Sequence, residues 1–216
     1  MSPLLTTVNL NRARTLFLWA TCLLSIGAAT AQSPLPLSAK PGQSAASTTK
    51  AVKAKEDLPN FHEVHPFLYR GGEPSREGMK KIKEMGITTI FDLRNPGEKS
   101  YDEKEEARQL GIRYISMPMN SKAPTQKQIK RLLEEIDRAK EKTPSTDSEK
   151  SAKNAVLVHC AHGSDRTGCM IGIWRVMRDG YNYDSAYQEM RKYWFTPKFT
   201  NLSGAVKSAA GNIKAQ

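Results

Sequence analysis

From residue 61 onward, the chain alternates between short apolar runs and longer segments that carry the signals of helices. The apolar runs predict strands, the first of them one strand or a pair of short ones, over residues 64–70, 87–93, 112–119 and 155–159. Caps, glycine stops and apolar residues at helical spacing predict helices over residues 75–85, 102–110, 125–142, 169–178 and 184–193. This alternation predicts a single α/β domain with a mainly parallel sheet that is flanked by helices on both faces.

The segments outside this pattern differ from it in composition. Residues 1–31 combine a basic start, an apolar core and an Ala-Thr-Ala cleavage site, which predicts a secretory signal peptide. Residues 32–59 are rich in Ser, Ala, Pro, Thr and Lys without a hydrophobic period, which predicts a disordered linker. We therefore expect an exported protein, periplasmic or secreted in a bacterium, with one domain at residues 60–200 and a helical or flexible tail at residues 201–216.

The sequence HCAHGSDRTG, from His159 to Gly168, lies between the last predicted strand and the helix after it. Its successive backbone N–H groups can surround a tetrahedral anion, and the positive end of the helix favours the same charge. Arg166 can hold two oxygens of a phosphate through its planar guanidinium group. Gly163 and Gly168 lie where a curled backbone leaves least room for a side chain. The residues expected to bind the substrate are Ala161, His162, Gly163, Ser164 and Arg166.

Cys160 places a thiol at the floor of this phosphate cradle, by which we mean the loop formed by residues 159–168. A helix N-terminus and a neighbouring cation lower the pKa of a cysteine, so Cys160 is the expected nucleophile. It would attack phosphorus in line and give a cysteinyl-phosphate that water then hydrolyses. Thr167 can donate its hydroxyl to the thiolate, and His159 is expected to orient the loop.

The cradle resembles the HCxxGxxR(S/T)G signature of the cysteine-dependent protein tyrosine and dual-specificity phosphatases. The matching residues are His159, Cys160, Gly163, Arg166, Thr167 and Gly168. Residues 68–75 (LYRGGEPS), 87–95 (ITTIFDLRN) and 111–119 (GIRYISMPM) are similar to the small atypical dual-specificity phosphatases of bacteria, plants and fungi. The resemblance implies a protein tyrosine phosphatase fold and the hydrolysis of phosphate monoesters, such as phosphotyrosine, without a metal or cofactor.

The general acid is left open by the sequence. The family usually supplies an Asp from the loop that precedes the long helix, but residues 120–124 here contain no carboxylate. Asp165 is the candidate that we favour, and its competing role is structural, since an Asp at this place can accept loop N–H bonds or orient Arg166. Asp102 or Glu103 is a third possibility.

For several other residues, the sequence indicates a part in the site less strongly. Asp92 and Arg94 match a recurring family feature and are expected to support the floor of the site. Cys169 is either a resolving thiol or, as we favour, a small core residue. His62, Glu63 and His65 have the chemistry of metal ligands, but their spacing is not that of a catalytic zinc motif, so we expect no metal.

A formal net charge of +11 favours anionic partners. We expect a phosphorylated protein or a small phosphate ester as the partner, with no nucleic acid, no stable membrane insertion after signal cleavage, and a monomeric state. Basic residues could frame the site for inositide substrates, namely Lys122, Lys127, Lys130 and Arg131. Three further functions are compatible with the sequence: a phosphate-binding module whose turnover has decayed, a rhodanese-like sulfurtransferase, and an envelope adaptor that acts through residues 32–59.

Overall fold

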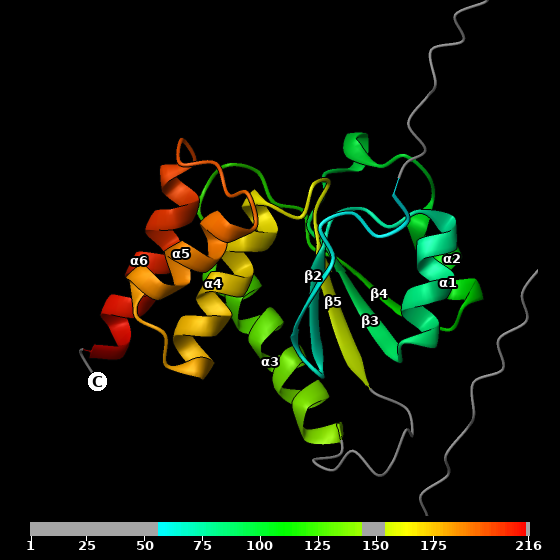
Figure 1. Ribbon diagram of the computed structural model, residues 1–216, viewed down its shortest axis with the longest axis horizontal. Helices are drawn as coiled ribbons and strands as arrows, with labels where there is room; N and C mark the ends of the chain where they lie inside the picture. Colours follow the sequence, from blue (N-terminus) through cyan, green and yellow to red (C-terminus); the bar gives the residue numbers. More distant parts are fainter. Residues whose placement is uncertain (1–55, 144–153, 215–216) are drawn as a thin grey trace, which may run out of the picture. The chain divides into compact units, whose positions relative to one another are not determined.

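The computed structural model describes residues 56–143 and 154–214, so the predicted signal and most of the predicted linker lie outside the described residues. Five strands form one sheet in the order β1-β2-β5-β3-β4 (Figure 1). Their bounds are β1 His62–His65, β2 Leu68–Gly71, β3 Ile87–Asp92, β4 Arg113–Ser116 and β5 Ala155–His159. All neighbouring pairs are parallel except β1 with β2, which is antiparallel. The predicted mainly parallel sheet is confirmed.

Helices cover both faces of this sheet (Figure 1). One face carries α1 (Arg76–Glu84) and α2 (Glu103–Gln109), and a short 3-10 turn, η1 (Pro96–Glu98), precedes α2. The other face carries α3 (Gln126–Lys142) and α4 (Asp165–Asp179), with α5 (Tyr183–Lys192) and α6 (Thr200–Lys214) packed outside them. None of the helices in the described ranges combines the length and the apolar character that a membrane crossing needs.

Side-chain alternation along β5 builds the two halves of the core. Val156 and Val158 contact the cluster under α3 to α6, whereas Ala155 and Leu157 belong to the cluster under α1 and α2. Every residue of β5 is buried, as expected for a central parallel strand covered on both faces. Cys160 follows β5 and belongs to the α3 to α6 side.

The predicted caps are present at the helix starts. Ser75 Oγ accepts the Gly78 N–H at 3.0 Å, and Thr125 with Gln128 forms a capping box at the start of α3. Gly180, with φ of +72°, ends α4 in the left-handed conformation. The strand predicted over residues 112–119 is shorter than expected: β4 ends at Ser116, although the N–H groups of Met117 and Met119 still bond to the Asp92 and Leu93 carbonyls at 2.9 and 3.0 Å.

Both ends of the domain differ from the predicted boundaries. The Pro59 carbonyl accepts the Gly72 N–H at 2.8 Å, and Asp57 accepts hydrogen bonds from Ser75 Oγ at 2.6 Å and Ser75 N at 2.9 Å, so the end of the predicted linker packs on the domain. Residues after 200 form α6, whose Leu202 and Val206 are fully buried against α4. The packed domain therefore extends beyond residues 60–200 in both directions.

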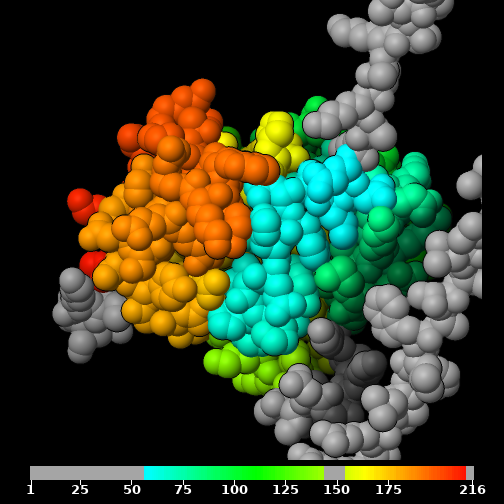
Figure 2. All heavy atoms as spheres, in the orientation of Figure 1, coloured from blue at the N-terminus to red at the C-terminus, as the bar shows by residue number. Residues whose placement is uncertain are grey.

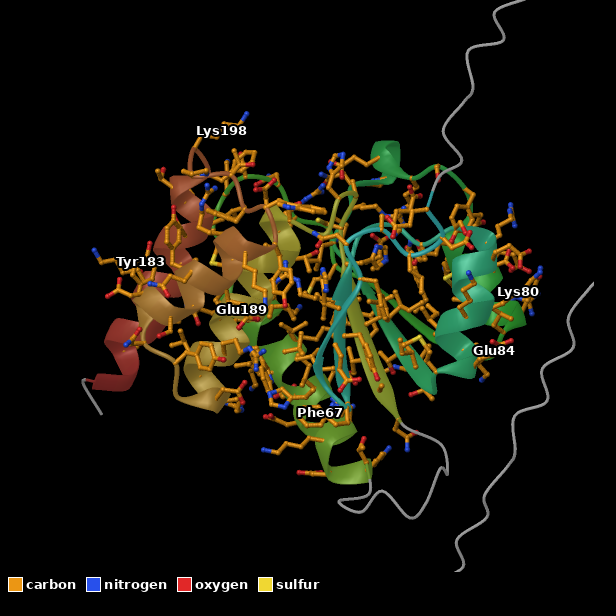
Figure 3. The ribbon with its side chains drawn as sticks, in the orientation of Figure 1. Phe67, Lys80, Glu84, Tyr183, Glu189 and Lys198 are labelled. Carbon is orange, nitrogen blue, oxygen red and sulfur yellow. The ribbon has the colours of Figure 1, made fainter. Side chains whose placement is uncertain are left out.

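The helices around α4 are also joined by charge pairs. Arg175 on α4 contacts Glu189 on α5 with an Nε–Oε2 distance of 2.9 Å. Lys80 and Glu84, by contrast, lie exposed on the outer side of α1 (Figure 3). Figure 2 shows the beginning of the domain, in cyan, beside the orange surface of α5, with the yellow surface of the segment after β5 between them. The cradle thus lies where three distant parts of the chain meet.

Candidate active site

The cradle follows the carboxyl end of β5 and leads into α4, as predicted. The helix begins earlier than expected, since Asp165 and Arg166 already belong to its first turn. Ser164 is the residue before the helix, and Cys160 is buried with 2% of its surface exposed. The first-turn N–H groups of α4, which have no partner within the helix, therefore point toward the loop.

The carbonyl groups of the cradle face outward and are bonded there. The Ala161 carbonyl accepts the Glu73 N–H at 3.2 Å, and the His162 carbonyl accepts Asn60 Nδ2 at 3.2 Å. The Gly163 carbonyl accepts Arg70 Nη2 at 2.8 Å. Because N–H and C=O point to opposite sides of a trans peptide, these bonds turn the N–H groups toward the inside. These neighbours hold the cradle in shape.

Gly163 is required by a close approach of two backbones. Its φ is +73°, and a Cβ atom added to it would lie 2.5 Å from the carbonyl carbon of Gly71 and 2.6 Å from the nitrogen of Gly72. Both the conformation and the space therefore call for glycine. The Gly-Gly pair at the end of β2 is the surface on which the cradle rests.

Several donors act on the Cys160 thiol. Burial alone would raise its pKa. The pKa is nevertheless lowered below its ordinary value by hydrogen bonds from the hydroxyl and backbone N–H of Thr167, by the charge of Arg166 and by the His162 N–H. The thiolate is the form that attacks phosphorus. The structure thus brings Cys160, Thr167 and Arg166 together, and their roles in catalysis stay predictions.

Arg166 is also engaged by a residue that sequence reasoning missed. Its Nη1 atom lies 2.5 Å from Glu98 Oε2 in η1 and donates to the carbonyls of Leu93 and Met119 at 3.3 Å each. Hydrogen bonds from Asn95 and the Arg166 charge lower the pKa of Glu98, although its partial burial acts in the opposite direction. The only sequence signal for this residue is the Asn-Pro-Gly-Glu turn that follows the DLR segment.

A buried ionic cluster lies beneath the cradle. Arg94 contacts Asp92 Oδ1 through Nε at 2.8 Å and Glu103 Oε2 through Nη2 at 2.5 Å, and it also pairs with Glu73. His159 Nε2 lies 2.9 Å from the other oxygen of Glu103. Burial opposes charge on His159, but Glu103 and Asp92 raise its pKa overall. Asp92 and Arg94 therefore support the floor through Glu103 and His159.

This cluster also bears on a possible metal site and on the general acid. Asp92, Glu103 and His159 bring metal-type ligand atoms within 4.8 Å of one another, but Arg94 already supplies the positive charge between the carboxylates. Glu103 is fully buried in these contacts, and Asp102 caps α2 by accepting the Glu105 N–H at 3.1 Å. Neither residue lines the cavity above the cradle, and both carboxylates are engaged elsewhere, which favours Asp165 over them as the candidate general acid.

The proposed metal-type residues at the start of the domain have separate partners. His62 packs on Tyr193, Glu63 accepts the Tyr69 hydroxyl at 2.9 Å, and His65 pairs with Asp179 at 2.9 Å. They therefore do not converge on a common point.

Cys169 lies on α4 within the core. Its Sγ contacts the Leu202 carbonyl at 3.3 Å, and burial raises its pKa to about 12. These contacts agree with a small core residue and not with a resolving thiol, which needs an accessible thiolate.

Asp165 lines the cavity above the cradle, and one of its oxygens is engaged. Oδ1 accepts the Thr196 N–H at 2.7 Å and so fixes the segment that follows α5. The cavity has a volume of about 860 Å³. Three more carboxylates and one large aromatic side chain line it, namely Glu56, Glu73, Glu98 and Trp194. Asp165 is therefore at the mouth of the site, as its candidate role requires.

Arg70 on β2 is a second residue that sequence reasoning missed. It is fully buried, its Cζ lies 4.2 Å from the centre of the Tyr193 ring, and burial is the main cause that lowers its pKa to about 10. Arg70 pairs with Val158 in the parallel register of β2 and β5, and its charge interacts with Cys160. The LYRGGEPS stretch contained this residue, but only the long-range contacts give it a role.

Comparisons with known proteins identify the class to which this geometry belongs. Residues 41–207 match the model of the family described as DSP-PTPase phosphatase fused to NAD+ kinase. The dual specificity protein phosphatase TpbA of Pseudomonas aeruginosa strain UCBPP-PA14 is 21% identical over 136 residues, which cover 63% of this chain and 55% of that protein. The chain thus spans about half the length of the curated relatives named TpbA that it matches.

Solved structures show the same fold at lower sequence similarity. The crystal structure of P. aeruginosa TpbA aligns with a TM-score of 0.58 and 20% identity, over 73% of this chain and 90% of that one, and another structure of TpbA is a complex with pTyr. PTPMT1 in complex with PI(5)P aligns with a TM-score of 0.58 and 12% identity, over 72% of this chain and 97% of that one. At these identities the likeness shows the fold alone.

Proposed function

The chain belongs to the DSP-PTPase family of protein tyrosine and dual-specificity phosphatases, and from this membership we propose that it hydrolyses phosphate monoesters through a cysteinyl-phosphate on Cys160. The observation that carries the proposal is the lowered pKa of Cys160 within a cradle of inward N–H groups, next to Arg166. Aryl esters such as phosphotyrosine are the substrates with which we would begin.

Two steps account for the reaction. In the first, the Cys160 thiolate attacks phosphorus opposite the ester oxygen, the S–P bond forms as the P–O bond breaks, and the leaving alkoxide or phenoxide takes a proton from a general acid. In the second, water attacks phosphorus and restores the thiolate, while the Thr167 hydroxyl stabilises the sulfur as it departs. The cradle N–H groups and Arg166 hold the three remaining phosphate oxygens in both steps.

Asp165 is the proposed general acid. It lines the cavity beside Ser164, and the bond from Thr196 to Oδ1 fixes its carboxyl group in orientation. The same residue would then act as a base toward water in the second step. Glu98 also lines the cavity, but its ion pair with Arg166 keeps it charged and makes it a poorer proton donor.

Turnover of p-nitrophenyl phosphate by the purified chain tests the proposal, with reductant and chelator present and Cys160→Ser as the control. Turnover that is lost in the control supports cysteine catalysis without a metal. If the parent protein shows no turnover but still binds vanadate, a phosphate-binding module is favoured instead. If it neither turns over substrate nor binds vanadate, the interpretation of residues 159–168 as a phosphate-binding loop is refuted.

Phosphoinositides are the second candidate substrates, since PTPMT1 has been solved with PI(5)P. The cavity of this chain is lined by Glu56, Glu98 and Asp165, and none of the four basic residues suggested from the sequence lines it. Carboxylates at the mouth repel additional phosphate groups, which favours esters with a single phosphate. Comparison of kcat/KM for a phosphotyrosine peptide and for PI(5)P would decide between the two.

We also propose export and a monomeric state for the mature protein. Export is supported by the composition of residues 1–31 alone. The N-terminal sequence of the mature protein and its distribution between cell fractions would test export. Light scattering would test the monomer, and a uniform dimer would refute it.

A further inference from the structure

The segment after α5 holds Trp194 in a conformation that large residues avoid. Its φ is +66°, in the left-handed region, and 69% of its surface is exposed. For a bulky residue this backbone conformation is a true outlier and persists only where the surrounding structure imposes it. Trp194 is also one of the two large hydrophobic side chains that are exposed among the described residues.

Trp194 takes this conformation at the end of α5, where its N–H bonds to the Arg191 carbonyl at 3.1 Å in a helix-ending pattern that usually places a left-handed glycine there. Its neighbours hold the segment from both sides. Before it, the Tyr193 ring covers the Arg70 guanidinium at 4.2 Å. After it, Phe195 is fully buried and its N–H bonds to the Met190 carbonyl at 3.0 Å, while the Thr196 N–H bonds to Asp165 at 2.7 Å. With both flanks directed inward, the indole of Trp194 is left outside.

The place to which the indole is directed is the active site. Trp194 lines the cavity above the cradle together with His162, Ser164 and Asp165. The end of α5 explains the left-handed backbone, but glycine would adopt it with less strain, and the exposed tryptophan ring gains little burial in return. The position of the ring is suited to a contact with the part of the substrate that bears the phosphate.

We propose that Trp194 is a specificity-determining residue that stacks on the planar group of the substrate and favours aryl over alkyl phosphates. This inference rests on the proposed function and deepens it. Aromatic rings stack with an offset or edge to face, and such a contact changes affinity by roughly 2- to 10-fold. The contact stabilises the bound substrate and the transition state to the same extent. Its loss therefore raises KM and leaves kcat nearly unchanged.

The test compares two peptides of identical sequence, one with phosphotyrosine and one with phosphoserine. Trp194→Gly is the main variant, because glycine accepts a φ of +66° without strain and the variant should therefore fold at least as well as the parent. We expect KM for the phosphotyrosine peptide to rise by roughly 2- to 10-fold, with kcat and the phosphoserine kinetics nearly unchanged. Trp194→Phe should restore most of the preference.

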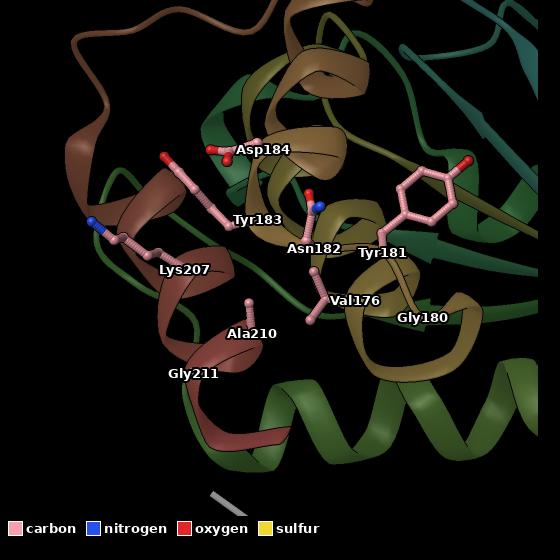
Figure 4. Close-up of a pocket in the computed structure, with 9 residues that line it drawn as sticks. All are labelled: Val176, Gly180, Tyr181, Asn182, Tyr183, Asp184, Lys207, Ala210 and Gly211. Carbon is pink, nitrogen blue, oxygen red and sulfur yellow. The ribbon is translucent and has the colours of Figure 1, made fainter. Parts of the chain in front are cut away.

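Tyr181→Ala provides the matched control. Tyr181 is the other large exposed hydrophobic residue among those described, and it lines a separate cavity of about 660 Å³ between the end of α4 and α6 (Figure 4). The control should leave both peptides unaffected. A parallel loss for both peptides in Trp194→Gly, or no loss for either, would overturn the proposal.

Failure of the proposed function would be recognised separately. If the parent hydrolyses neither peptide, calorimetric binding of p-nitrophenyl phosphate and of orthophosphate still tests Trp194. In that case Trp194→Gly should weaken binding of the aryl ester and leave orthophosphate unchanged. Equal weakening of both would refute the stacking role, whatever the chemistry at Cys160.

Discussion

Glu98 and Arg166 form an ion pair of 2.5 Å at the mouth of the cradle, and they lie 68 positions apart in the sequence. Arg166 is therefore turned toward a carboxylate, which offers the same pair of oxygens as a phosphate would. A phosphate ester that enters the cradle competes with Glu98 for this guanidinium group.

The first prediction follows from this competition. Glu98→Gln removes the negative charge and leaves a side chain of similar size, so vanadate and phosphate esters should bind more tightly. Because the side chains are 15% and 36% exposed, we expect a gain of up to about 5-fold, as for a solvent-accessible pair. The inhibition constants of vanadate for the parent and for Glu98→Gln measure this gain in affinity. Weaker inhibition would mean that Glu98 instead holds Arg166 in its working position.

Arg70 allows a prediction about the reactivity of Cys160. Arg70→Met removes the bond to the Gly163 carbonyl and the buried charge, while it keeps an apolar side chain under Tyr193. We expect kcat to fall by about tenfold, the loss of about one charge-assisted hydrogen bond, and the pKa of Cys160 to rise. The pH dependence of iodoacetamide alkylation reports that pKa.

Arg70→Lys is the companion variant. It restores a positive charge without the forked geometry, so it should recover the pKa of Cys160 more fully than it recovers kcat. Equal alkylation profiles in the parent and both variants would show that Arg70 acts on the shape of the loop alone.

Asp165 can be tested through the leaving group. Asp165→Asn retains an oxygen that accepts the Thr196 N–H, so the segment that carries Trp194 should stay in place. Phenyl phosphate, with a poor leaving group, should lose about 100-fold in kcat, whereas p-nitrophenyl phosphate should lose little. An equal loss for both esters would assign Asp165 a structural role.

His159 makes stability depend on pH. Glu103 and Asp92 raise its pKa above the ordinary value of 6.5, despite burial. The charged imidazole therefore stabilises the fold fully below about pH 6.5, and this contribution is lost as pH rises through the higher pKa of the folded state. Denaturant unfolding of the parent and of His159→Asn should give a difference that shrinks with rising pH. A constant difference would contradict the pairing.

The sequence predicted the features that depend on neighbouring positions. The helices from Ser75 and Thr125 have caps within three residues, and β5 is a continuous apolar run, so periodicity was sufficient. The cradle was predictable for the same reason, since Cys160 and Arg166 belong to one loop.

Features that depend on distant contacts were not predictable in this way. Arg70 meets Gly163 across 93 positions, and nothing near either residue signals the contact. Glu98 was an ordinary turn residue in the sequence, and the role of Trp194 depends on a backbone conformation at the end of α5 that its flanking anchors hold in place. Charged residues acquire such partners only when the sheet brings their loops to one edge.

The outward bonds of the cradle carbonyls have a consequence for the end of the catalytic cycle. Because Asn60, Arg70 and Glu73 hold the loop through its carbonyls, binding of a tetrahedral oxyanion requires little reorganisation of the loop itself, and only the Arg166–Glu98 pair has to open. Orthophosphate, released at the end of each turnover, meets the same donors as the ester. We therefore expect competitive product inhibition. The phosphate concentration around the protein would then set the fraction of protein molecules whose cradle is free to bind substrate.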